Sequence, residues 1–264
     1  MEKLIKGFEL FRKVTYPAKQ RLFKKLASAQ APHTLVITCA DSRVVPEYFT
    51  SSEPGQLFVV RNVGNIVPPY AQFVGGVSAA IEYAVVALGV KDIVVCGHSD
   101  CGAMKATLDP KSVASMNAVS AWLRHAEIAR HVLDENYKET DDRSRLRALT
   151  EENVIAQLDH LRTHPAVAAR LAAGRIAIHG WIYDIETADI RLLDPDTRRF
   201  VSLMSTDDPA YDAGNDGSAP APAGKSGASG GRPAPVEKTA SSSRAERAGR
   251  SGSARSVSYA GGEL

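Results

Sequence analysis

The sequence predicts an α/β fold with a mostly parallel β-sheet flanked by helices. Three short runs rich in β-branched residues, 34–38, 57–60 and 92–95, are apolar without clean alternation. Continuous apolar strands of this kind are typical of parallel sheets that are covered on both faces. Between the last two runs lies an apolar helical segment, 74–88, which ends near Gly89. Strand, helix and strand in this order indicate a βαβ unit.

The first thirty residues are expected to form a helical arm ahead of the sheet. Apolar side chains recur at helical spacing on both sides of a break at Pro17: Leu4, Ile5, Phe8 and Phe11 before it, and Leu22, Phe23 and Leu26 after it. The apolar stripe of the first helix needs cover from its own chain or from a neighbour.

After the βαβ unit, helices are followed by two further strands. Apolar spacing predicts helices over 117–133 and 146–161. Pro165 suits the first turn of a short helix that ends at Gly174. The runs 176–183 and 190–193 then predict two strands joined by a turn around Thr187.

The composition of the chain changes at about residue 205. With 264 residues, of which 44% are hydrophobic, the chain can bury a full core. From 205 onward Gly, Ser, Ala and Pro dominate, and large apolar groups are too few to offset the ordering entropy. We therefore expect one domain over 1–204, with the arm over 1–30, and a disordered low-complexity tail over 205–264. The tail is locally basic, but a solvated linker is favoured over a nucleic-acid site because aromatic side chains do not alternate with its charges.

Cysteine use and hydropathy favour a cytoplasmic protein. Three cysteines do not suggest a disulfide framework, and Cys96, in an apolar run, is interpreted as a small buried hydrophobe. No apolar run reaches the length of a membrane span, and the first residues lack a signal-peptide core.

Two polar motifs close two of the predicted strands: Cys39-x-Asp41-x-Arg43 follows the first, and His98-x-x-Cys101 follows the third. Two Cys and one His make a ligand set that suits zinc, and three protein ligands leave the fourth position for water or substrate. His-x-x-Cys alone is weak evidence, because a His after a strand is more often an ordinary core or loop residue. Asp41 and Arg43 strengthen the case for a functional site, since open α/β sheets form their sites at the carboxyl ends of strands.

The series of motifs resembles the β-class carbonic anhydrases. The resemblance is carried by Cys39-x-Asp41-x-Arg43, by the segments 58–69, 80–84 and 97–102, and by 180–184 near the last strands. Ala40 stands where many members have Ser, but it is not a ligand. The resemblance implies zinc ligation by Cys39, His98 and Cys101. It also implies a catalytic dyad in which Asp41 accepts a hydrogen bond from the reacting water while Arg43 holds the carboxylate.

The resemblance further implies a substrate pocket with a hydrogen-bond donor, apolar walls and a backbone N–H near the product. These roles fall on Gln30 as donor, on Phe58, Val63 and Tyr83 as walls, and on Gly102 as the backbone N–H. Several would come from a neighbouring subunit, around which the helical arm would wrap, so a homodimer or higher even oligomer is expected. Ordinary packing, a solvated helix end and a turn remain the alternatives. The other histidines, any of which could shuttle protons, are His33, His125, His131, His160, His164 and His179.

The function implied by the resemblance is reversible hydration of carbon dioxide to bicarbonate and a proton, a lyase reaction that needs Zn²⁺. Two alternatives stay open: a zinc-dependent hydrolase of CS2 or COS, and a non-catalytic zinc-binding module. The module would be favoured by a lost dyad or by a fourth permanent Cys or His ligand, and the two motifs contain neither.

Regulation by bicarbonate is not expected. In some relatives the counterpart of Asp41 leaves that of Arg43 and takes the fourth metal position, and bicarbonate stabilises this state in a pocket that includes a Trp. Here that Trp position is Val36, which has no indole N–H, although the Arg of the pocket has a match in Arg61. We expect Asp41 to stay paired with Arg43 and bicarbonate to act only as product.

Overall fold

The computed structural model describes residues 1–70, 75–137 and 141–204, so the predicted tail lies outside the described residues. The described chain contains one sheet with the strand order β2-β1-β3-β4-β5-β6. Its strands are β1 (Thr34–Cys39), β2 (Leu57–Asn62), β3 (Asp92–His98), β4 (Ala177–Tyr183), β5 (Ile190–Leu193) and β6 (Phe200–Ser202). The first four are parallel to one another, whereas β5 is antiparallel to β4 and β6 is antiparallel to β5. The predicted fold class is confirmed.

The two central strands, β1 and β3, are buried almost throughout. Every residue of β1 is buried, and so is every residue of β3 after Asp92. Thr34 is in register with Asp92 and Thr38 with Cys96, so the two strands start together. Because parallel neighbours run in the same direction, their last residues, Cys39 and His98, lie at the same edge of the sheet.

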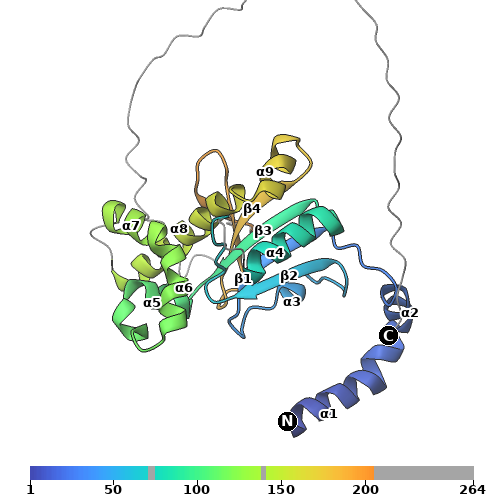
Figure 1. Ribbon diagram of the computed structural model, residues 1–264. Coiled ribbons are helices and arrows are strands. Elements are labelled where there is room, and N and C mark those ends of the chain that lie inside the picture. Colours follow the sequence, from blue (N-terminus) through green and yellow to red (C-terminus); the bar gives the residue numbers. More distant parts are fainter. Residues whose placement is uncertain (71–74, 138–140, 205–264) are drawn as a thin grey trace, which may run out of the picture. The chain divides into compact units, whose positions relative to one another are not determined.

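Helices flank the sheet, except α1 and α2, which form an N-terminal arm with no buried residue (Figure 1). They are α1 (Glu2–Leu10), α2 (Tyr16–Leu26), α3 (Pro46–Phe49), α4 (Gly76–Glu82), α5 (Gly102–Leu108), α6 (Asn117–Leu123), α7 (Glu127–Asn136), α8 (Asp142–Arg162) and α9 (Pro165–Ala172). The predicted crossover helix consists of α4 and the π-helical turn Tyr83–Leu88, and it ends at Gly89 with φ +69°.

Three apolar clusters hold these layers together. On one face of the sheet, Leu35 and Ile93 pack with side chains of α4, α8 and α9. On the opposite face, Val36 and Cys96 form a smaller cluster with Phe49 of α3. The third cluster joins α5, α6, α7 and α8 and includes both metal-ligand candidates Cys39 and Cys101. The carboxyl edge of the sheet is therefore backed by a helical core.

The structure differs from the predicted elements in several places. The break expected at Pro17 falls two residues later: the chain is helical from Glu2 through the π-helical turn Phe11–Thr15 into α2, and it kinks at Lys19, where φ is −114° and ψ is 15°. The helix expected over 117–133 is divided into α6 and α7 by a short 3-10 turn, Arg124–Ala126. The short elements α3, α5 and β6 were not predicted. No helix in the described part of the chain has the length and hydropathy to span a bilayer.

Candidate metal centre

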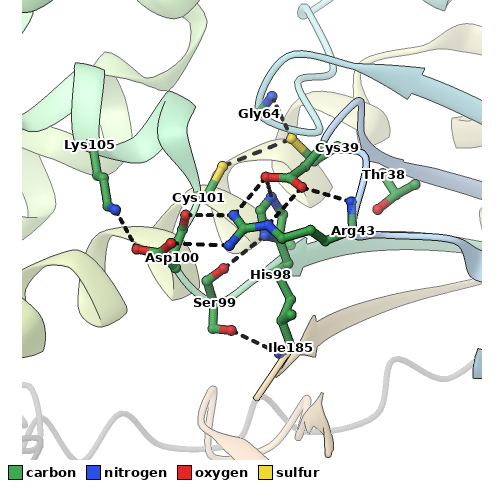
Figure 2. A network of polar contacts seen from close by, with 12 residues as sticks. Thr38, Cys39, Arg43, Gly64, His98, Ser99, Asp100, Cys101, Lys105 and Ile185 are labelled. Atoms are coloured by element: carbon green, nitrogen blue, oxygen red, sulfur yellow. Dashed lines mark hydrogen bonds and ion pairs between the residues drawn. The ribbon is translucent and has the colours of Figure 1, made fainter. Parts of the chain in front are cut away.

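Three potential metal ligands converge where β1 and β3 end. Cys39 and His98 are the last residues of the two strands, and Cys101 caps the start of α5. All three side chains are buried. One ligand atom from each lies within 4.8 Å of the others. The predicted ligand set is therefore brought together by adjacent strands and the helix that follows them (Figure 2).

The distances fit a small tetrahedral metal ion. The two sulfur atoms, Cys39 Sγ and Cys101 Sγ, are 4.0 Å apart. Two thiolates bound tetrahedrally to zinc at about 2.3 Å would be about 3.8 Å apart. Only a small contraction would therefore be needed.

The imidazole of His98 is oriented as a metal ligand. Its Nδ1 lies 2.8 Å from Ser99 O, and because a carbonyl oxygen only accepts, Nδ1 carries the proton. Its Nε2 is buried and has no hydrogen-bond partner among the described residues; Asp41 Oδ2, at 3.9 Å, is too distant. An unpaired buried nitrogen is costly unless something binds it. A metal ion between His98 and the two sulfurs would satisfy it.

The pKa values of the two cysteine thiols are shifted in opposite directions. The Cys101 thiol and then the Gly64 N–H stabilise the Cys39 thiolate and lower the pKa of Cys39. The same contact with Cys39, together with burial, raises the pKa of Cys101. The site thus holds one thiolate before any metal binds, and metal binding would displace the remaining proton. Cys96 behaves differently: it is fully buried, and burial raises its pKa to about 12.

Asp41 and Arg43 form a bidentate ion pair beside the ligands. Arg43 Nε lies 3.0 Å from Asp41 Oδ1, and Arg43 Nη2 lies 2.8 Å from Asp41 Oδ2. The backbone N–H of Arg43 also donates to Asp41 Oδ1 over 3.0 Å. These hydrogen bonds hold the pKa of Asp41 well below its usual range, so the carboxylate is ionised.

Two further residues hold the dyad, and the sequence interpretation did not single them out for this. The Arg43 guanidinium also donates to Asp100, from Nη1 to Oδ2 over 3.2 Å and from Nη2 to the backbone O over 3.3 Å. Asp100 forms a second ion pair, with Lys105. Asp100 has a left-handed backbone conformation, with φ +57°. Arg61 donates to Cys39 O over 3.2 Å and to Asp41 O over 2.6 Å. The only sequence signal was their position within or near the motifs.

The predicted pocket residues are not gathered around the ligands within one chain. Gln30 is exposed and precedes the start of β1. Cys39 is the last residue of β1, about 16 Å from the first residue of that strand at the usual rise per residue. Phe58 is in register with Leu35, near the starting ends of the strands, and its ring lies 6.0 Å from that of Tyr83. Val63 and Gly102, in contrast, flank the candidate metal centre: Val63 precedes Gly64, which contacts Cys39, and Gly102 follows Cys101.

Several histidines have structural partners. His160 Nδ1 lies 2.9 Å from Val67 O, and His164 Nε2 lies 3.0 Å from Pro68 O. His179 Nε2 pairs with Asp92 at 2.8 Å. These contacts are at the loop after β2 and at the starting end of β3, so they give none of the three a position beside the ligands.

Comparisons with known proteins agree with this geometry. The carbonic anhydrase family model matches residues 34–190. A carbonic anhydrase of Pseudomonas aeruginosa is 52% identical over 221 residues, which are 84% of this chain and 100% of that protein. Carbonic anhydrase 1 of Escherichia coli O157:H7 is 53% identical over 205 residues, 78% of this chain and 93% of that protein.

Solved structures give the same result. The β-carbonic anhydrase CcaA matches with a TM-score of 0.75 and 42% identity, covering 78% of this chain and 93% of that one. One of two tetrameric β-carbonic anhydrases from Sordaria macrospora matches with a TM-score of 0.67 and 31% identity, covering 73% and 95%. The chain belongs to the β-class carbonic anhydrase family of enzymes.

Proposed function

We propose that this enzyme binds one zinc ion per chain through Cys39, His98 and Cys101 and interconverts carbon dioxide and water with bicarbonate and a proton. The observation that carries the proposal is the unpaired, buried Nε2 of His98 facing two sulfur atoms that are 4.0 Å apart. Membership of the family supports the reaction, and the Cys-His-Cys donor set supports zinc.

The dyad would orient the reacting water. Zinc, when bound, supplies a Lewis acid that brings the pKa of water down from about 15.7 toward about 7. Asp41 is ionised and can only accept hydrogen bonds, so it would hold one O–H of the water and direct the oxygen lone pair at the carbon of CO2. Arg43 and Asp100 fix the plane of that carboxylate, which keeps its direction constant.

We also propose that the pocket is completed across a dimer. Gln30, Phe58 and Tyr83 lie at the opposite end of the strands from Cys39, so these residues would serve the site of a neighbouring copy. The apolar side chains of α1 are exposed in the single chain, and a partner would cover them. Val63 and Gly102 would act in their own chain. We further propose a cytoplasmic location, which the three free cysteines support. The catalytic domain would end near residue 204, as the composition of the tail indicates.

Metal content and turnover test the proposal together. Elemental analysis should find about one zinc per chain, and a stopped-flow indicator assay should detect CO2 hydration. Asp41→Asn should keep its zinc and lose turnover by about a hundredfold or more, as is typical when a proton-handling group is removed. Hydrolysis of COS without hydration of CO2 would support the rival enzymatic reading instead, and zinc with neither activity would indicate a binding module.

A further inference from the structure

One peptide unit connects Trp122 to the candidate metal ligand Cys39. The indole N–H of Trp122, on α6, donates to Val63 O over 2.8 Å. The Gly64 N–H, at the other end of the same peptide unit, donates to Cys39 Sγ over 3.4 Å. Because a peptide unit is planar and trans, a hydrogen bond that fixes its oxygen also fixes the direction of its N–H.

The next peptide unit is held as well. Asn153 of α8 is fully buried, and its Nδ2 donates to Gly64 O over 3.1 Å. Gln157 donates to Asn153 Oδ1 over 2.9 Å and so sets the orientation of that amide. Gly64 itself has φ +82°, and a Cβ there would lie 3.0 Å from Ala103 Cβ. Side chains from two helices therefore hold the peptide units on both sides of Gly64.

We infer that Trp122 is a positioning residue of the metal centre, a conclusion that rests on the proposed metal-dependent function. It aims the Gly64 N–H at the Cys39 sulfur. A donor on the carbonyl oxygen also polarises the peptide, which strengthens the N–H as a donor. A hydrogen bond to a ligand sulfur draws negative charge from it and tunes the metal, and outer partners of this kind orient the ligand.

A purely structural role would be different. Trp122 is partly buried and packs against the cluster that joins α5, α6, α7 and α8, so any truncation of it removes packing. Packing loss alone would lower the melting temperature and leave the electronic state of the sulfur unchanged. The test therefore needs a readout at the sulfur.

Trp122→Phe removes the N–H and keeps an aromatic ring. The matched control is Trp181→Phe, the same chemical change at the other Trp of the chain, which is partly buried in the cluster of Val36, Val94 and Cys96. Asn153→Ala, which frees the neighbouring peptide unit, is an independent second variant should Trp122→Phe fail to fold. The full-length proteins are loaded with Co²⁺ for absorption spectra and with Zn²⁺ for competition against a chromogenic chelator.

We expect Trp122→Phe and Asn153→Ala to shift the thiolate-to-cobalt charge-transfer band to longer wavelength, because a sulfur that loses its hydrogen bond is more electron-rich. Their zinc affinity should fall by about tenfold, as for other outer partners of metal ligands. Trp181→Phe should match the wild type in both. A Trp122→Phe band and affinity equal to those of Trp181→Phe would overturn the inference. A wild-type protein that takes up no metal would overturn the proposed function instead.

Discussion

Gly97→Ala tests how tightly the core is packed behind the candidate metal ligand His98. Gly97 precedes His98 in β3, and a Cβ there would lie 2.9 Å from Val154 Cγ2, 3.1 Å from Ile182 Cδ1 and 3.3 Å from Thr150 Cγ2. Carbon atoms prefer separations of about 3.5–4.0 Å. All three neighbours are buried, and Val154 and Thr150 are β-branched with contact atoms placed by χ1 alone, so these two side chains have few alternative rotamers. The strain must be taken up by α8, β3 or β4.

The magnitude follows from overpacking. Inserting one methyl group into a filled core typically costs about 1–3 kcal/mol, and three close contacts place Gly97→Ala near the middle, at about 2 kcal/mol. For a domain of about 200 residues, each kcal/mol lowers the melting temperature by about 2–4 °C. Gly97→Ala should therefore melt about 4–8 °C below the wild type.

Thermal unfolding followed by circular dichroism measures this shift. Gly76→Ala is the control, because nothing lies within 4 Å of a Cβ at Gly76, in the first turn of α4. Its melting temperature should be unchanged or slightly higher, since Ala costs less conformational entropy than Gly in a helix. If Gly97→Ala melted within about 1 °C of the wild type, well under the expected shift, the core would be looser than these distances indicate.

Four further results are expected. Cys101→Ser should lose most of its zinc, because a hydroxyl is a far poorer ligand than a thiolate, and full zinc content by elemental analysis would remove Cys101 from the site. Because Arg43 lowers the pKa of Asp41, the stability from their pair is complete above about pH 4 and is lost on acidification below it. The melting temperature of Asp41→Asn should therefore depend less on pH below about pH 4 than that of the wild type. An equally steep fall of the melting temperature in both proteins would contradict the pairing. A chain that ends at Met204 should keep its turnover and melting temperature, so a large loss of either would show that the tail contributes. Turnover should rise with pH through a single ionisation, and a steep acid loss deepened by added bicarbonate would show that the proposal of unregulated turnover is wrong.

The buried framework could be predicted from the sequence because its signals are local. The runs that became β1 and β3 are apolar and β-branched, and such runs suit strands covered on both faces. Cys39 and His98 could be placed together because each ends one of these strands. Short elements escaped prediction: α3 has four residues and β6 has three, too few to show a periodicity.

The contacts that hold the site could not be predicted, because they join residues far apart in sequence. Trp122 bonds to a residue 59 positions away, and Asn153 to one 89 positions away. The Asp100 contact with Arg43 depends on a left-handed backbone at Asp100, which a non-glycine residue adopts only in a particular tertiary setting. The resemblance to the family supplied the ligands and the dyad, but not these supports.

The strand order has a consequence for how the site can change. From β1 the chain moves outward to β2, and after β3 it moves to the opposite side toward β4. The connections that leave β1 and β3 therefore diverge, and such a topological switch point opens a crevice at the carboxyl ends of the two strands. Cys39 and His98 stand on its two sides because of the order of the strands, whatever residues form the outer hairpin β5–β6. We expect sequence change in that hairpin to leave the candidate ligands in place, whereas changes in the diverging connections alter the site directly.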